Sequence, residues 1–137
     1  MLLKLRAGEK LYINGAVIRV DRRATVELLN DAAFLLEAHV IQPNEANTPL
    51  RQLYFVLQTC LMDREAAPMV TNMFKTMLDD TRAAFGPGEV ADGLRAASGL
   101  AEAGRTFEAM RALRALFPLE AELMTIKPLT PPAGPGV

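Results

Sequence analysis

The sequence predicts an α+β fold, in which an N-terminal antiparallel sheet precedes a helical half. Up to about residue 42, apolar and polar residues alternate in short runs typical of strands, and beyond that point apolar residues recur at helical spacing. We expect a meander or small barrel-like sheet at 1–42 and about four helices packed on it at 43–124, together making one compact domain. Residues 125–137 contain four prolines and two glycines, which predict a disordered tail.

The most specific local signal is Asn14-Gly15, which lies between two alternating runs. Asn-Gly favours a two-residue type I′ turn, so Lys10 should lie opposite Arg19. The apolar face of this hairpin then holds Leu11, Ile13, Ala16 and Ile18, and the other face holds Lys10, Tyr12, Val17 and Arg19. Like charges at a cross-strand pair destabilise it by roughly 0.2–1 kcal/mol. An anionic partner would explain the pair.

Residues 24–40 are compatible with two structures. Asn30-Asp31 separates the runs 25–29 and 32–36, which predicts a second hairpin with apolar residues on both faces. Such a strand pair would be covered on both sides. A helix over 25–36 is the alternative, because its apolar residues also fit helical spacing. We favour the strands.

The helical half starts after a polar connector that contains Pro43. Thr48 is a good N-cap and Pro49 a good first helical residue, so the first helix should begin there. The later helices are expected at about 68–85, 90–103 and 106–117. Gly86-Pro87-Gly88 should end the second of these four helices. Gly93 and Gly99 should weaken the third. Pro118 should end or bend the fourth.

The charges are unevenly distributed although the net charge is only −1. Residues 1–25 hold six cations against two acids, whereas residues 26–80 hold three cations against eight acids. A basic end and an acidic middle predict separate partners. The single cysteine, Cys60, excludes an internal disulfide framework. No signal peptide is visible and no stretch approaches the roughly 20 apolar residues of a membrane helix, so we expect a soluble, cytoplasmic protein with no membrane partner.

The chain offers little for catalysis. His39 is the only histidine and Cys60 the only cysteine, so a nucleophile–histidine set or a zinc ligand cluster cannot be assembled within one subunit. Cys60 lies on the apolar side of a predicted helix, where a buried small hydrophobe is its ordinary role. Asp79 and Asp80 are adjacent and point apart on a helix, which indicates a hydrated surface. We expect no enzyme, no metal and no cofactor.

The strand region contains a candidate nucleic-acid surface. Its cations could bind phosphates, and an aromatic ring could stack on an unpaired base. The candidate RNA-binding residues are Lys4, Arg6, Lys10, Tyr12, Arg19, Arg22 and Arg23. The alternative is a solvated sheet face whose cations only keep an edge strand from pairing.

The second predicted helix carries a methionine-rich stripe. Its members are Met69, Met73, Phe74 and Met77. Core filling is the ordinary role of such a stripe, but methionine also suits adaptable grooves that bind a partner helix. These four residues are therefore the candidate groove for a protein partner.

Three separated motifs resemble the FlbT family. They are Leu-Arg-Ala-Gly-Glu-Lys-Leu-Tyr-Ile-Asn-Gly-Ala-Val at 5–17, Leu-Leu-Asn-Asp and Phe-Leu-Leu-Glu at 28–31 and 34–37, and Thr-Pro-Leu-Arg-Gln-Leu-Tyr-Phe at 48–55. The resemblance extends to about Met124. It implies a flagellar regulator of alphaproteobacteria that represses flagellin synthesis after transcription, through the 5′ untranslated region of the flagellin message. It also implies an opposing partner, the small helical protein FlaF, and no catalytic activity.

The segment 6–13 is similar to the Arg-x-Gly-Glu-x-Leu-x-Ile opening of the CsrA translational repressors. The first strand of those repressors contributes arginine to an RNA-binding edge, and Arg6 matches that arginine. Leu5 stands where the repressors have a second arginine, and they are small strand-exchanged dimers without a helical half. The likeness therefore implies a role for Arg6 and for no other residue.

These observations predict a post-transcriptional repressor whose partner is the flagellin mRNA leader. The competing hypothesis is a chaperone-like adaptor that binds FlaF or flagellin through the methionine-rich stripe and affects the message indirectly. Apolar residues on both faces of 26–36 also predict a homo-oligomer.

Overall fold

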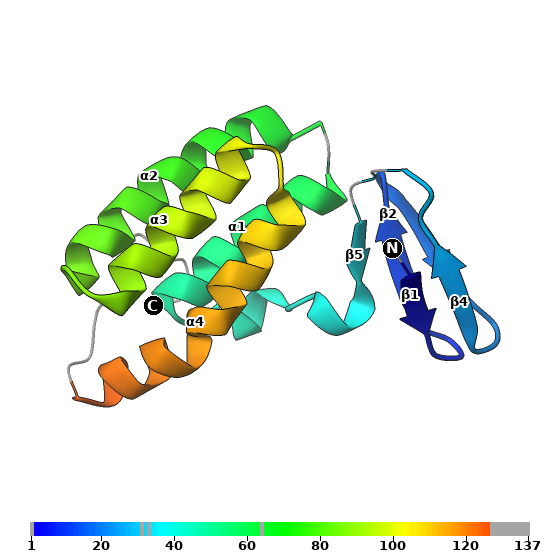
Figure 1. The fold of residues 1–137 in the computed structure, drawn as a ribbon, viewed down its shortest axis with the longest axis horizontal. Helices are drawn as coiled ribbons and strands as arrows, with labels where there is room; N and C mark the ends of the chain where they lie inside the picture. The colour runs from blue at the N-terminus through cyan, green and yellow to red at the C-terminus, as the bar shows by residue number, and fades with distance from the viewer. Residues whose placement is uncertain (1, 31, 33, 64, 127–137) are drawn as a thin grey trace.

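The computed structural model describes residues 2–30, 32, 34–63 and 65–126, and these adopt the predicted α+β fold. Short strands lie at one end of a bundle of helices (Figure 1). The strands are β1 (Leu2–Leu5), β2 (Lys10–Ile13), β3 (Ala16–Arg19), β4 (Ala24–Glu27) and β5 (Phe34–Leu36). Two 3₁₀ turns follow, η1 (Glu37–His39) and η2 (Pro43–Glu45). The helices are α1 (Pro49–Met62), α2 (Ala67–Phe85), α3 (Glu89–Glu102) and α4 (Thr106–Ile126).

The β2–β3 hairpin has the predicted register. Lys10 lies opposite Arg19, and Asn14 and Gly15 form the turn between the strands. Their φ angles of 48° and 84° lie in the left-handed region that a type I′ turn requires. Because this turn chemistry is local, the pairing could be predicted from the sequence.

The strands at 24–36 are confirmed and the helical alternative is wrong, but the predicted pairing within this region is also wrong. β4 pairs with β1, with Ala24 opposite Leu5, and β5 pairs with β2, with Leu35 opposite Tyr12. The result is two antiparallel sheets, ordered β1–β4 and β3–β2–β5. β5 is covered on both faces in this position, because Phe34 packs on the first sheet and the fully buried Leu35 packs on the helices.

Two apolar clusters hold the strand layer. Leu3 and Leu5 of β1 pack with Leu11 and Phe34, whereas Tyr12 packs against the helical core. The central strand β2 therefore has cover on both sides, which is what apolar residues on both faces require.

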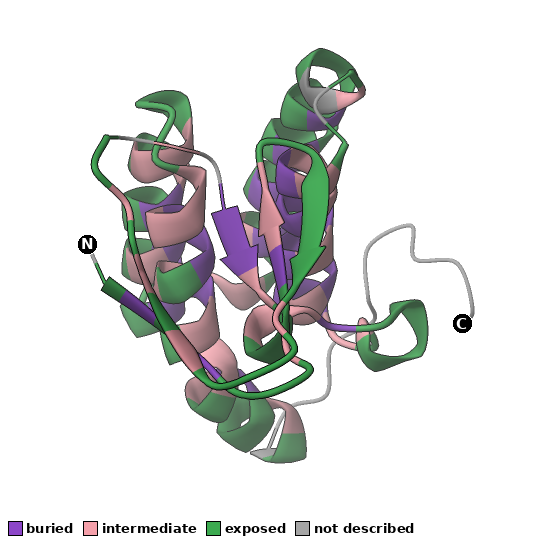
Figure 2. Cartoon of the chain, turned by 90° about the vertical axis from the view of Figure 1, so that its right-hand side faces the viewer, coloured by how far each residue is buried: buried purple, intermediate pink, exposed green. Residues whose placement is uncertain are grey.

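The edge strand β3 is less covered than its pattern predicts. All four of its residues are exposed (Figure 2). Ile18 lies on the same face as Leu11, as the register requires, yet 45% of it remains exposed. On the expected apolar face of the hairpin, Leu11 of β2 is therefore buried, whereas Ala16 and Ile18 of β3 are exposed.

The start of α1 and the end of α3 have recognisable caps. The Thr48 hydroxyl accepts a hydrogen bond from the Arg51 N–H at 3.2 Å, which caps α1 as predicted. α3 ends in a Schellman motif, in which Gly104 has a φ of 78° and the Arg105 N–H donates to the Leu100 carbonyl at 2.9 Å. α1 packs against α2 and α4, and α3 packs against the same two helices (Figure 1).

α4 continues past Pro118 and changes direction toward its C-terminal end (Figure 1). Proline removes a backbone donor and bends a helix, but here the segment beyond it is anchored. Glu120 is 1% exposed, and its carboxylate accepts a hydrogen bond from the Leu50 N–H at 2.8 Å. The expected tail is therefore wrong for residues 125 and 126, which are helical. The rest of that tail, 127–137, lies outside the described residues.

Candidate nucleic-acid interface

Two loops at one end of the strand layer lie side by side. The turn 6–9 joins β1 to β2, and the corner 20–23 joins β3 to β4. The Gly8 N–H donates to the Val20 carbonyl at 2.7 Å, and the Val20 N–H donates to the Glu9 carbonyl at 3.2 Å. These hydrogen bonds extend the β2–β3 ladder, so the cations of the two loops are brought together.

Five exposed cations lie on or beside these loops, and we call this set the basic end: Arg6, Lys10, Arg19, Arg22 and Arg23. Lys10 and Arg19 are direct cross-strand neighbours, as predicted. The acids within the same stretch are Glu9 and Asp21. The Glu9 carboxylate accepts a hydrogen bond from the Arg6 N–H at 2.9 Å and so closes the turn. The basic end therefore keeps an excess of positive charge.

Lys4 and Tyr12 lie apart from the basic end. Lys4 alternates with Leu3 and Leu5, which face the inner cluster, so its side chain extends from the outer face of the β1–β4 sheet. Tyr12 shares the face of Lys10 and Arg19, as the register requires, but its ring is partly buried against the helical core. The seven candidate residues thus do not share one face.

A hollow of about 470 Å³ lies between the strand layer and α4. Its apolar lining comes from Leu3, Phe34, Leu36, Phe107, Met110 and Ala115. Its polar lining comes from His39, Tyr54, Arg111 and Arg114. The Phe107 and Phe34 rings have centroids 4.8 Å apart, and the His39 and Phe107 rings meet edge-on at 5.8 Å.

Tyr54 and Arg114 hold the turn that carries His39. The Tyr54 hydroxyl donates to the His39 carbonyl, and the Arg114 Nη2 donates to the same carbonyl at 3.1 Å and to the Tyr54 hydroxyl at 2.6 Å. The Arg114 guanidinium also lies over the Tyr54 ring, 5.0 Å from its centroid. Burial raises the pKa of Tyr54, so the phenol keeps the proton that it donates.

His39 is a neutral side chain in this hollow. Burial lowers its pKa below the usual value, the charges of Arg114 and Arg111 lower the pKa further, and Glu9 opposes them. Its buried Nδ1 has no hydrogen-bond partner among the described residues. The Lys10 N–H donates to the Glu37 carboxylate at 3.3 Å, and Glu37 belongs to the turn that carries His39, so the hollow and the basic end are neighbours.

Arg111 and Arg114 line the hollow but are not predicted as site residues from the sequence. Both lie on α4, far along the chain from the strands, so no local pattern connected them to the basic end. The available signal was their spacing of three on a helix, which puts them on one side. Both side chains line the hollow and add two positive charges to it.

The methionine-rich stripe is divided between the core and the surface. Phe74 is 3% exposed and Met77 packs against the core, whereas Met69 and Met73 are 79% and 48% exposed. The four side chains therefore do not line one open groove. Met69 and Met73 are the members that a partner could reach.

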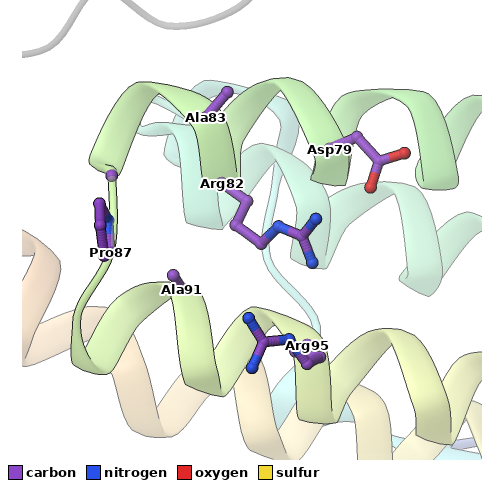
Figure 3. Close-up of a pocket in the computed structure, with 7 residues that line it drawn as sticks. Asp79, Arg82, Ala83, Pro87, Ala91 and Arg95 are labelled. Carbon is purple, nitrogen blue, oxygen red and sulfur yellow. The ribbon is translucent and has the colours of Figure 1, made fainter.

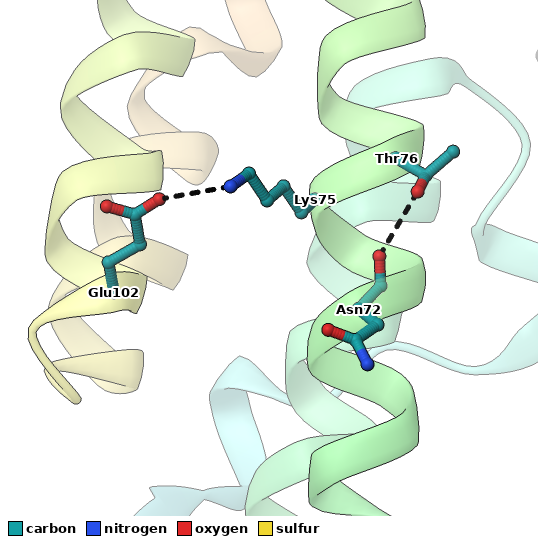
Figure 4. A network of polar contacts seen from close by, with 4 residues as sticks. All are labelled: Asn72, Lys75, Thr76 and Glu102. Atoms are coloured by element: carbon teal, nitrogen blue, oxygen red, sulfur yellow. Dashed lines mark hydrogen bonds and ion pairs between the residues drawn. The ribbon is translucent and has the colours of Figure 1, made fainter.

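The exposed side of α2 also carries polar contacts. The Lys75 Nζ lies 3.9 Å from the Glu102 carboxylate of α3, and the Thr76 hydroxyl donates to the Asn72 carbonyl at 3.3 Å (Figure 4). Exposed ion pairs of this kind contribute little to stability. They show that this surface is solvated.

A second hollow, of about 380 Å³, lies at the α2–α3 connection, at the end of the bundle away from the strands (Figures 1 and 3). Gly86, with a φ of 75°, ends α2 here as predicted. Asp79, Arg82 and Arg95 line the hollow. Its charges are mixed, in contrast to those of the basic end.

The described residues give no metal centre, since no group of three or more His, Cys, Asp or Glu side chains among them could hold an ion. In the same part of the chain, none of the helices has the length and apolar character needed to span a bilayer. Cys60 packs partly buried against the helical core, and burial raises its pKa. Its thiol is therefore protonated at neutral pH, in keeping with the predicted structural role.

The family model of the flagellar protein FlbT matches residues 1–124. Three similar proteins are each described as "probable flagellum biosynthesis repressor protein FlbT". That of Chelativorans sp. (strain BNC1) is 48% identical over 123 residues, which cover 90% of this chain and 85% of that protein. Those of Agrobacterium fabrum and Brucella ovis are 43% and 47% identical over 94% and 95% of this chain, and over 87% and 86% of their own lengths. No solved structure matches the chain.

Proposed function

This chain belongs to the FlbT family of flagellum biosynthesis repressors, and we propose that it represses after transcription, by binding the 5′ untranslated leader of flagellin mRNA at the basic end. The observation that carries the proposal is the pairing of the loops 6–9 and 20–23, which gathers five exposed cations. Lys10 and Arg19 repel each other in the free protein, and a phosphate between them would turn that repulsion into attraction. The family resemblance supplies the identity of the message.

Phosphate contacts would make binding depend on salt. Each phosphate neutralised by a cation releases counterions, and for single strands log K falls by about 0.7 per contact with log salt concentration. Five contacts would give a slope of about −3.5. A protein held on the leader in this way would compete with the translation machinery for the same segment.

The test is a titration of labelled flagellin leader RNA over a range of salt concentrations. The test variant carries alanine in place of Lys10, Arg19 and Arg22. A matched control carries alanine in place of Lys75, Arg95 and Arg105, which are also one exposed lysine and two exposed arginines. We expect the test variant to bind more weakly, with a slope reduced by about 2, and the control to bind like wild type. Equal affinity of wild type and the folded test variant would refute the proposal.

A second candidate function is the protein adaptor, which the exposure of Met69 and Met73 favours. Exposed methionines make adaptable contacts with an amphipathic partner helix. The test is capture of purified FlaF or flagellin in nuclease-treated solution by wild type and by a Met69→Ser, Met73→Ser variant. Capture that persists without RNA and is lost in the variant supports the adaptor, and capture that requires RNA counts against it.

We also propose that the chain forms a homo-oligomer through β3. This strand is the edge of its sheet, and its Val17 and Ile18 side chains are exposed. An unpaired edge is a template for a strand of another chain. Light scattering should then give a molar mass of at least twice 14.9 kDa, and a monomer mass at micromolar concentration would exclude the oligomer.

A further inference from the structure

We propose that the hollow between the strand layer and α4 is a pocket for one unstacked base of single-stranded RNA. This proposal rests on the proposed RNA-binding function and extends it from the phosphates to a base. It is carried by the position of an aromatic cavity beside the basic end, and by two arginines on its rim.

The hollow has the size and the lining that a base requires. Its volume of about 470 Å³ lies within the range of about 300–1,000 Å³ that is typical of small-ligand pockets. Phe34 and Phe107 form an aromatic wall, and Leu3 and Met110 extend it with apolar surface. Aromatic rings and guanidinium planes are the surfaces on which proteins stack unpaired bases.

The polar side chains of the hollow suit a ligand that joins an uncharged base to a phosphate. The neutral His39 ring can give a base edge one hydrogen bond, through the nitrogen other than the buried Nδ1. Arg111 is exposed at the rim, where a guanidinium can bind a phosphate through two hydrogen bonds. A nucleotide supplies both kinds of group in one ligand.

The pocket and the basic end are joined through the 3₁₀ turn η1. The Lys10 N–H lies 3.3 Å from the carboxylate of Glu37, which belongs to the same turn as His39. A single strand with its phosphates on the basic end can therefore place one base in the hollow. An apolar peptide side chain would fit the aromatic wall but would leave the cations around it without a counterpart, so we favour RNA.

The experiment compares two probes of equal length, an eight-nucleotide adenosine RNA and the same ribose–phosphate chain without bases. Both probes offer the same phosphates, so their affinity ratio reports base contacts alone. Stacking one base raises affinity by about 5- to 150-fold. We expect wild type to prefer the base-bearing probe by a factor in this range.

Two variants locate the preference. Ala115→Phe fills the hollow from an exposed position on its lining without changing charge, and Ala96→Phe, at an exposed position on α3, is its control. We expect Ala115→Phe to abolish the preference while binding the abasic probe like wild type, and Ala96→Phe to retain the preference. Arg111→Ala, which leaves the apolar lining intact and removes only a phosphate contact, should weaken binding of both probes and leave the preference unchanged.

The possible failures are distinguishable. Equal binding of both probes by wild type would overturn the pocket and leave the RNA-binding function standing, whereas binding of neither probe would remove that function and the pocket with it. A preference that survives in Ala115→Phe would also overturn the pocket. The pocket would also be overturned if Ala115→Phe weakened capture of purified FlaF or flagellin and left the preference for the base-bearing probe unchanged. The occupant of the hollow would then be a protein.

Discussion

Glu120 accepts a hydrogen bond at 2.8 Å from the backbone N–H of Leu50, and this contact ties the segment of α4 beyond Pro118 to the first turn of α1. The carboxylate satisfies a donor that a helix N-terminus leaves free, and its charge suits the positive end of the helix. Glu120→Ala should therefore lower the free energy of unfolding by about 1–2 kcal/mol, measured by urea denaturation. Glu122→Ala, at an exposed position on the same helix, is the control and should change little.

The same carboxylate predicts a pH effect. Burial raises the pKa of Glu120, against the hydrogen bonds of Thr48 and Leu50 and the charge of Arg51, which lower it. The folded state therefore holds this proton more tightly than the unfolded state, so the stabilisation is complete below the unfolded pKa and is lost as the pH rises through the folded pKa. Glu120→Gln keeps an acceptor without the charge. We expect the stability of wild type relative to Glu120→Gln to fall as the pH rises through this window, and a constant difference would contradict the shift.

Two glycines of α3 should respond differently to alanine. A Cβ at Gly99 would meet no atom of the described residues within 4 Å, whereas a Cβ at Gly93 would lie 2.6 Å from the Leu116 Cδ1 on α4. Gly99→Ala should raise the free energy of unfolding by about 0.5–1 kcal/mol, because alanine is the better helix former. Gly93→Ala should gain less or lose stability, since Leu116 must move. Thermal unfolding of the two variants checks which one is more stable. Equal increases in stability would show that Leu116 moves aside without an energetic cost.

Two buried glutamines of α1 provide a second contrast. The Gln58 side chain accepts from the Ile41 N–H at 2.8 Å and donates to the Ile41 carbonyl at 2.9 Å, whereas the buried Gln52 Oε1 has no partner within the part of the chain that the structure describes. Gln58→Leu should destabilise by about 1–3 kcal/mol, because it leaves two backbone groups of Ile41 unpaired. Gln52→Leu should be neutral or stabilising. Urea denaturation of the two variants compares the free energy lost when the hydrogen bonds to Ile41 are broken with the effect of removing a buried amide whose oxygen is unpaired among the described residues.

The elements that the sequence predicts correctly are those with local causes. Asn14-Gly15 determines the hairpin register, and Thr48-Pro49 determines the start of α1, because both act through the backbone of neighbouring residues. The pairing of β4 and β5 is different. It depends on which partner buries Leu35, and the sequence pattern of one strand does not contain that information.

The candidate site follows the same division. The cations of the basic end could be identified because they are close in sequence, and the hydrogen bonds between Gly8, Glu9 and Val20 then bring their loops together. The alternation along 3–20 predicts a single sheet with Lys4 beside these cations, but β1 belongs to a second sheet, in which Lys4 faces outward. Arg111 and Arg114 come from another element, so only the packing of α4 against the strands connects them to the site.

This division predicts that Lys4 and Arg19 contribute unequally to RNA binding, although both are exposed cations of the strand layer. Arg19 lies opposite Lys10 at the basic end, whereas Lys4 extends from the outer face of the β1–β4 sheet. Arg19→Ala should weaken binding of the leader and reduce the magnitude of the salt slope by about 0.7, the value for one phosphate contact with a single strand. Lys4→Ala should leave the affinity within about twofold and the slope unchanged, because its side chain extends from the outer face of the β1–β4 sheet and contacts no phosphate held at the basic end. Titrations at several salt concentrations compare the two variants, which remove the same charge. A larger slope change for Lys4→Ala than for Arg19→Ala would move the interface from the basic end to the outer sheet face.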